Sequence, residues 1–546
     1  MRTMGKLAAA VVLLATLAAR AEDPAVTAFR RVDGAVLSPD EAKSRVHELV
    51  LAMSQAGLSR TSTIALSLIS GDAAQDAAVR EAARAELAAR AAQDPGFAQS
   101  LLAKQDEGAK LPPLLSLRLA RAHLERALQL APLEEGVAFQ AIQGPPAAVP
   151  ADADASVQKP AASTGGASSH VAAEQIDRAR ALAASVPAGD ALETEAHEVS
   201  GLAALAANDN DGAQREFLAV SQAGVRRGDD EAGERRDRAL LQLARIAYAQ
   251  GDDAKAEQIY RRVSRGAPEW LDALFEASWS HFRRGEDEKA LGNLLTLHAP
   301  FFQGRFFPES FVLKALVLYE NCRYGDARRA LADFEQRYRP LHDGLAELLG
   351  KLPTAQGAYE FLAGGPVVLA QTVAPGARED VARLEQEPDL RGSLAAVSEL
   401  GQEIDSFDGR PPEFRRIAQR LAPAARQARL ELLETTGRRL LSRLNGERGD
   451  LRELLGQSLR LSFEIAGREK ELASTNEPAA VAPPKYERPS VDDDEVLWPF
   501  EGEYWRDELG TYRYHLGQRC RGGAKVTPVQ TAAQPPAKPR AAAVQP

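Results

Sequence analysis

The side chains that could carry catalysis or hold a metal ion are scattered along this chain. Its eight histidines include no H-E-x-x-H pair and no other metal-ligand spacing. The nearest approach to a calcium loop, residues 208–212, fails because Ala207 would hold the first ligand position. A glycine-rich phosphate loop followed by Lys and a nucleophile elbow are both missing from the sequence. We therefore expect a protein that is not an enzyme and that uses no metal ion and no cofactor.

Residues 1–21 have the pattern of an export signal. Arg2 and Lys6 are positive, residues 7–18 are apolar, and residues 19–21 give a small-x-small cleavage site. The apolar run is shorter than the ~20 residues that a membrane span requires. With no cysteine near the cut, we expect no lipid anchor. We predict a signal peptide and a mature chain in the periplasm, elsewhere in the cell envelope, or secreted.

Export changes the interpretation of the two cysteines, Cys322 and Cys520. Two thiols exclude an iron–sulfur cluster on four thiolates and an all-cysteine zinc site within this chain. In an oxidising compartment an even number of cysteines favours disulfides. The pair is therefore a disulfide candidate, and two unrelated free thiols are the alternative.

Composition favours helices and argues against nucleic-acid binding. The chain has 67 Lys and Arg against 77 Asp and Glu, a net charge of −10, whereas a dedicated nucleic-acid binder is usually basic. Ala, Leu, Arg and Glu are abundant, and all four are good helix formers. Alternating β-branched runs bounded by hairpin turns are missing from the sequence. We predict an all-α fold.

Pro-, Ala- and Gly-rich or acidic stretches interrupt the helical periodicity and divide the chain. After the signal peptide we predict an N-terminal helical region (40–142), a disordered linker (143–170), helical repeats (171–340), a C-terminal helical region with long helices (341–475), a second linker (476–493), an aromatic docking segment (494–520) and a disordered tail (521–546). Six aromatic residues fall between Trp498 and Tyr514. Because a soluble protein would not leave them all in water, we expect this segment to pack onto the helices or to bind a partner itself.

A 34-residue period runs through the repeat region. Gly251 and Ala256 recur one period later as Gly285 and Ala290, and a third unit follows a short insertion. Small residues are expected where paired helices cross, and the two glycines where a left-handed cap is required. The residues expected to pack within the repeats are Ala244, Gly251, Ala256, Tyr260, Ser278, Gly285, Ala290, Ala315 and Ala327. Pro268 and Pro340 are predicted to end the second helix of a unit.

This spacing resembles the tetratricopeptide repeat (TPR) family, most clearly over residues 190–340. The usual Trp near the start of the repeat is Leu240 and Leu274 here. The resemblance implies an α-solenoid of helical hairpins that binds peptides or partner proteins on its concave face. The candidates for that face are Arg245, Tyr248, Ser280, His281, Arg283 and Lys314. For each of them, the alternative is a side chain that is merely solvated.

Residues 411–473 carry apolar residues at steps of mostly three, four or seven, as long amphipathic helices do. Gly446 and Gly449 suggest a break or a turn, and hence a long helical hairpin or a coiled-coil-like extension. Two interpretations stay open. The helices pack on the end of the solenoid, or they form a seam for a partner helix or for a second copy in a homo-oligomer.

The complete layout resembles the large exported TPR proteins of myxobacteria and their relatives. The residues that carry this resemblance are ENCRY at 320–324 and WPFEGEYW at 498–505. Only 13 of the 67 basic residues are Lys, which is typical of high-GC bacterial coding. We expect a scaffold that mediates protein–protein interactions in a bacterial cell-envelope assembly of the motility, secretion or outer-membrane machinery. The alternatives are a self-associating structural envelope protein and an accessory subunit of a periplasmic enzyme.

Overall fold

A computed structural model describes residues 23–93, 97–102, 112–130, 166–225, 228–474, 496–497 and 500–516. Every regular element within these ranges is a helix, so the all-α prediction is confirmed. The predicted signal peptide, the second linker (476–493) and the tail (521–546) lie outside the described residues. The first linker was predicted over 143–170, but a helix begins at Gly166. Within the described residues, no helix is both long enough and apolar enough to span a bilayer.

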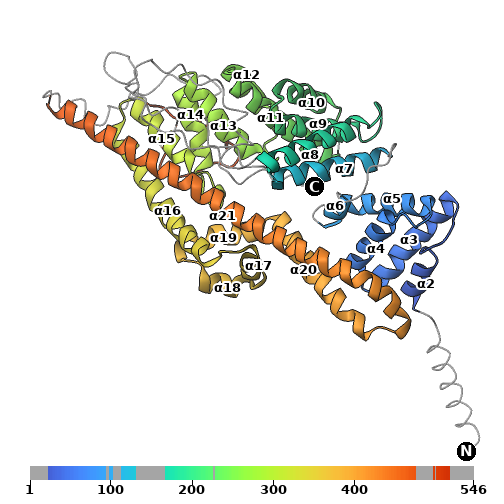
Figure 1. Cartoon of the computed structure of the whole chain (residues 1–546). Coiled ribbons are helices and arrows are strands. Elements are labelled where there is room, and N and C mark those ends of the chain that lie inside the picture. The colour runs from blue at the N-terminus through green and yellow to red at the C-terminus, as the bar shows by residue number, and fades with distance from the viewer. Residues whose placement is uncertain are drawn as a thin grey trace, which may run out of the picture. The chain divides into compact units, whose positions relative to one another are not determined.

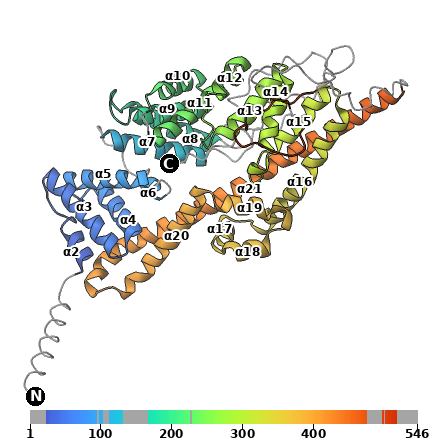
Figure 2. The same cartoon turned by 180° about the vertical axis from the view of Figure 1, so that it is seen from behind.

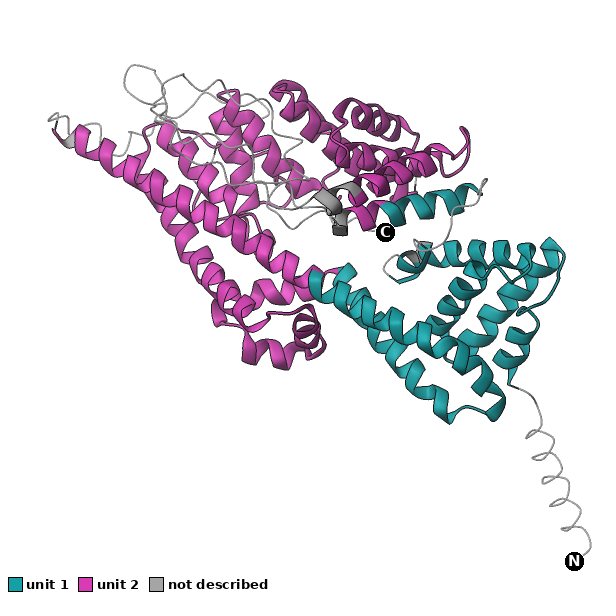
Figure 3. Cartoon of the chain, viewed as in Figure 1, with its two compact units in different colours: residues 1–123, 388–438, 546 teal, residues 124–387, 439–545 magenta. Residues whose placement is uncertain are grey.

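The chain forms two compact units (Figure 3). Unit 1 comprises the residues up to 123 together with 388–438, and unit 2 comprises 124–387 together with the chain from 439. The predicted C-terminal helical region, 341–475, is therefore shared between the units. Two helices, α7 (Pro113–Leu130) and α21 (Arg415–Ser474), contain residues of both.

Unit 1 joins the N-terminal helices to a distant part of the chain. Its remaining elements are α2 (Pro24–Arg30), α3 (Pro39–Gln55), α4 (Ser59–Gly71), α5 (Ala77–Gln93), α6 (Phe97–Leu102), α20 (Pro388–Asp405), η4 (Ser406–Gly409) and η5 (Pro412–Phe414). Helix α4 packs against α3, α5 and α20, which gives the unit a shared apolar core.

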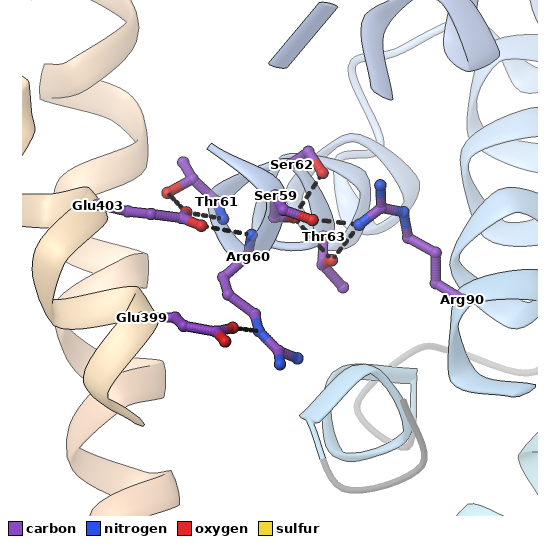
Figure 4. Close-up of polar contacts among 8 residues, drawn as sticks. All are labelled: Ser59, Arg60, Thr61, Ser62, Thr63, Arg90, Glu399 and Glu403. Carbon is purple, nitrogen blue, oxygen red and sulfur yellow. Dashed lines mark hydrogen bonds and ion pairs between the residues drawn. The ribbon is translucent and has the colours of Figure 1, made fainter. Parts of the chain in front are cut away.

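The contact between α4 and α20 centres on one buried carboxylate (Figure 4). Helix α4 has no side-chain cap of its own at Leu58. Instead, Glu403 of α20 accepts hydrogen bonds from the backbone N–H groups of Arg60 and Thr61, at 2.8 and 2.6 Å, and from the Thr61 hydroxyl at 2.7 Å. The first N–H groups of a helix have no partner within the helix, and a negative charge there is favourable. Glu403 therefore caps α4 from a distant part of the sequence.

Unit 2 contains most of the helices. They are α8 (Gly166–Ala184), α9 (Glu193–Ala206), α10 (Asn210–Gln222), α11 (Asp230–Ala249), α12 (Asp253–Tyr260), α13 (Trp270–Arg283), α14 (Asp287–Leu297), η2 (Pro300–Phe302), α15 (Glu309–Glu320), α16 (Tyr324–Lys351), α17 (Ala355–Ala363), α18 (Gly365–Thr372), η3 (Pro375–Ala377) and α19 (Arg378–Glu385). From α8 to α16 each helix packs against the next one in sequence, and these helices lie side by side in both views (Figures 1 and 2). One continuous apolar core runs through the array from α9 to α16.

Two helix boundaries differ from the predictions. Pro340 lies inside α16, because Leu341, Leu345 and Leu348 continue a buried apolar face beyond it. Helix α12 ends at Tyr260, so Pro268 does not end it and instead stands two residues before α13.

The break expected at Gly446 and Gly449 is absent, since both glycines lie inside the 60-residue helix α21. Both are in open surroundings, with nothing within 4 Å of the position that a Cβ would take. The buried stripe of α21 continues past them, because Leu444 and Leu451 are both fully buried. Packing along that stripe therefore outweighs the modest helix penalty of the two glycines.

We predict that Glu403→Ala lowers the free energy of unfolding of unit 1 by about 2 kcal/mol, since it leaves a buried N–H group, a part-buried N–H group and a buried hydroxyl without their acceptor. The control is Glu399→Ala, which removes an exposed ion pair with Arg60 from the same helix (N–O distance 2.8 Å) and is expected to cost less than about 1 kcal/mol. Urea unfolding followed by circular dichroism measures both. Equal losses for the two variants would contradict the capping role.

Candidate interaction surface

Four turns in unit 2 share one backbone geometry. Each joins the first and second helices of a hairpin (α9–α10, α11–α12, α13–α14 and α15–α16) and contains one residue with positive φ. These residues are Asn208, Gly251, Gly285 and Cys322, at φ values of 60°, 80°, 74° and 59°. In every turn the residue that follows the positive-φ residue donates its backbone N–H to the carbonyl of the residue five positions before itself, at N–O distances of 2.8–3.0 Å. This bond pattern closes a helix with a left-handed residue, as a Schellman cap does.

The side chains around each turn repeat as well. Five residues after the turn residue stands a fully buried alanine, and nine residues after it a large buried side chain. The alanines are Ala213, Ala256, Ala290 and Ala327, and the large residues are Phe217, Tyr260, Leu294 and Leu331. Seven residues before the turn residue the first helix has a small residue: Gly201, Ala244, Ser278 or Ala315. At Gly201 the ring of Phe217 lies so close that a Cβ would be 2.8 Å from it. The helices of each hairpin thus approach at small residues, and the large residue fills the adjoining space.

Arg245, the first of the six predicted partner-binding residues, lies in the core between two hairpins. Its guanidinium donates from Nε and Nη2 to the Glu276 carboxylate at 2.7–3.1 Å, and the Tyr260 hydroxyl donates to the same carboxylate at 3.0 Å. Burial alone would lower the pKa of Arg245, but the charge and hydrogen bonds of Glu276 outweigh it and raise that pKa. Arg245 therefore joins α11 to α13 as a permanent cation.

Tyr248 and Arg283 form a second junction between the same hairpins. The Arg283 guanidinium stacks on the Tyr248 ring, 4.6 Å from its centroid, and its Nε lies 3.2 Å from the Asp253 carboxylate. Burial raises the pKa of Tyr248 to about 12, so its hydroxyl stays protonated. Tyr248 is buried, whereas the Arg283 side chain is 38% exposed and accessible to a partner.

Ser280, His281 and Lys314 complete the predicted set. Ser280 and His281 are buried, and His281 Nδ1 lies 2.6 Å from Glu286 Oε2. Burial lowers the pKa of His281, although the hydrogen bond to Glu286 opposes this. Lys314 is half-buried, and burial lowers its pKa despite the nearby charge of Asp333. Arg245, Tyr248, Ser280 and His281 are thus buried within the packing of the helices.

Residues 510–516 of the aromatic segment lie along α14. Their backbone runs in the opposite direction to the helix, because Gly510 N–H donates to Thr296 Oγ1 (2.9 Å) while Tyr514 N–H, further along, donates to the Glu288 carbonyl (2.9 Å). Three side chains of the segment are buried: Leu509, Tyr512 and Leu516. They pack against the helix array and extend its core.

Gly292 allows this close approach. It lies between Glu288 and Thr296 on one face of α14, and a Cβ at this position would overlap the carbonyl oxygen of Tyr512. The segment is held further by Leu516, whose N–H donates to Glu288 Oε1 (3.2 Å) and whose carbonyl accepts from Arg323 Nη1 (2.7 Å).

Cys322 occupies the last of the four turns, beside Arg323, and is half-buried. The Tyr324 hydroxyl donates to its Sγ at 3.5 Å. Cys520, its predicted partner in a disulfide, lies outside the described residues. The bridge therefore stays a prediction.

The described residues include no cluster suited to a metal ion. No group of three or more His, Cys, Asp or Glu side chains in them is placed to hold a metal ion. The calcium-like stretch 208–212 is a hairpin turn, in which Asp209 caps α10 by accepting from Gly212 N–H at 2.8 Å.

From residue 439 onward α21 packs against the hairpin array. Leu461 and Ile465 belong to the array's core, and Arg328 of α16 forms an ion pair with Glu469. The opposite face of the helix exposes Leu459 and Phe463, whose exposed fractions are 53% and 71%.

The docking residues of α14 were not predicted from the sequence. Glu288 and Thr296 look like ordinary surface residues of an amphipathic helix. Gly292 carried a signal, because an isolated glycine within a helical pattern costs about 1 kcal/mol relative to alanine, so its presence points to a packing role.

Comparison with known proteins gives no further guide to this arrangement. No family model matches the chain, no curated protein is significantly similar to it in sequence, and no solved structure is significantly similar in fold.

We predict that Gly285→Ala lowers the free energy of unfolding by about 1 kcal/mol, because an L-residue with a side chain is strained at φ 74°. The matched control is Gly233→Ala in α11, where nothing lies within 4 Å of the new Cβ, and alanine there is expected to be neutral or stabilising. Thermal and urea unfolding measure both variants. A Gly285→Ala protein as stable as the wild type would contradict the turn geometry.

Proposed function

We propose that the protein is an exported, non-enzymatic scaffold whose TPR-like α-solenoid in unit 2 binds other polypeptides in a bacterial cell-envelope assembly. The observation that carries this proposal is the fourfold recurrence of one turn, with its left-handed residue, its buried alanine and its large core residue at constant offsets. These offsets match those of the TPR resemblance found in the sequence. Helical hairpins repeated in this way stack into elongated arrays whose surfaces suit polypeptide ligands.

Polar contacts between successive hairpins support the solenoid. Arg245 with Glu276, and Arg283 with Asp253, join the second hairpin to the third. Asn321 Nδ2 donates to Asp287 Oδ2 at 3.0 Å and joins the third hairpin to the fourth at a separation of one repeat period. This last contact has the period of the sequence repeat, as stacking of equivalent units produces.

The proposed partner-binding face consists of the first helices, and Arg283 and Lys314 are the two predicted residues with accessible surface on it. Both are cationic groups at the boundary of the apolar core, which favours a partner with carboxylates next to apolar side chains.

Affinity capture from envelope extracts tests the scaffold role, with the mature protein as bait. We expect polypeptides to be retained, and Arg283→Glu to retain several-fold less of them. The matched control is Arg261→Glu, which reverses an exposed charge at the end of a second helix and leaves capture unchanged. Retention of small molecules without any polypeptide would contradict the proposed function.

A second candidate role is self-association through α21, favoured by the exposed Leu459 and Phe463, which lie one helical turn apart. Light scattering of the same preparation separates the two roles. A wild-type dimer that Phe463→Glu converts to a monomer would support self-association. A monomeric wild-type protein would contradict it.

We also propose that a disulfide joins Cys322 to Cys520. The docked segment supports it, because the Leu516 carbonyl is bound by Arg323, the neighbour of Cys322, and Cys520 follows only four residues later. Mass spectrometry of the non-reduced protein is expected to detect one peptide pair joining the two cysteines. Finding both thiols alkylated without prior reduction would rule the bridge out.

A further inference from the structure

Helix α14 differs from the other second helices at the position of Gly292. This position lies seven residues after the turn residue, and the equivalent positions in α10, α12 and α16 are Arg215, Gln258 and Arg329. A glycine inside a helix costs about 1 kcal/mol relative to alanine. The repeat itself therefore does not require Gly292, whereas the docked backbone of Tyr512 does.

The docked segment is held in part through its backbone. The N–H groups of Gly510, Tyr514 and Leu516 donate to Thr296 and Glu288, and the Leu516 carbonyl accepts from Arg323. Backbone contacts of this kind do not depend on side-chain identity, so another extended segment can make them equally well.

Side-chain selectivity comes from a few positions. Gly510 has φ 85°, and a Cβ there would be 2.9 Å from the Trp270 ring. Leu509, Tyr512 and Leu516 are buried, while Phe500 and Trp505 remain largely exposed, at 45% and 42%. The surface thus selects the pattern Leu-Gly-x-Tyr-x-x-x-Leu.

We propose that the face of α14 formed by Glu288, Gly292 and Thr296 is a binding site for extended polypeptides, and that residues 509–516 are its internal occupant. A partner with the pattern Leu-Gly-x-Tyr-x-x-x-Leu binds there by displacing this segment. The inference rests on the proposed polypeptide-binding function and adds a site on a second helix, away from the first-helix face. Because the internal segment is tethered to the site, it competes at a high effective concentration and keeps the site closed to weak ligands.

The test uses a fluorescent synthetic peptide of residues 500–516 and full-length protein, with a thiol reductant present so that no disulfide holds the internal segment. Tyr512→Ala/Leu516→Ala weakens the internal occupant by removing two of its three buried side chains. We expect this double variant to bind the peptide at least tenfold more tightly than the wild type. Adding Gly292→Ala is expected to reduce that binding at least tenfold, because the new methyl group occupies the space of the Tyr512 carbonyl.

Two controls make the result specific. A peptide with Gly510 replaced by valine is expected to bind at least tenfold more weakly, and circular dichroism should show that Gly292→Ala retains its helix content. No binding to the double variant, or equal binding with and without Gly292→Ala, would overturn the proposal and show that the docking is purely structural. Capture of partners on the Arg283 face is measured separately, so failure here is distinguishable from failure of the proposed function.

Discussion

The interaction on which unit 2 depends is the close approach of paired helices at small residues, closed by one residue in the left-handed region. That turn reverses the chain within three residues, and the buried alanine five positions after the left-handed residue lets the returning helix lie against the first. Without this close approach, the large side chains nine positions after the left-handed residue would have no adjoining space to fill. Each hairpin has apolar surface on both sides, so neighbours stack and share one core.

Much of this array could be predicted from the sequence, because the turns and crossings depend on local residue types. Gly285 and Ala290 repeat Gly251 and Ala256 at the interval of one hairpin, and all four lie where that spacing requires them. The left-handed conformation of Cys322 could not be predicted in the same way, since a residue other than glycine rarely adopts positive φ. The continuation of α16 through Pro340 also escaped prediction, because tertiary burial of the leucines beyond it outweighed the local preference.

The sequence could not indicate contacts between segments that are distant along the chain. The pairing of α20 with α4 depends on the carboxylate of Glu403 reaching backbone N–H groups near the other end of the chain, and no local pattern marks it. The same holds for the candidate surface. Four of the six residues expected to contact partners serve the packing instead, because polar side chains on first helices also lie where adjacent hairpins meet.

The most direct test of the stacked-hairpin account is hydrogen exchange measured by mass spectrometry across residues 193–351. If each hairpin is held by both neighbours, amides of α11 to α14 should be strongly protected and should lose that protection together as urea is added. If α11–α12 instead exchanges freely while α13–α14 remains protected, the hairpins do not share one core, and the account of the fold and of the function proposed from it is contradicted.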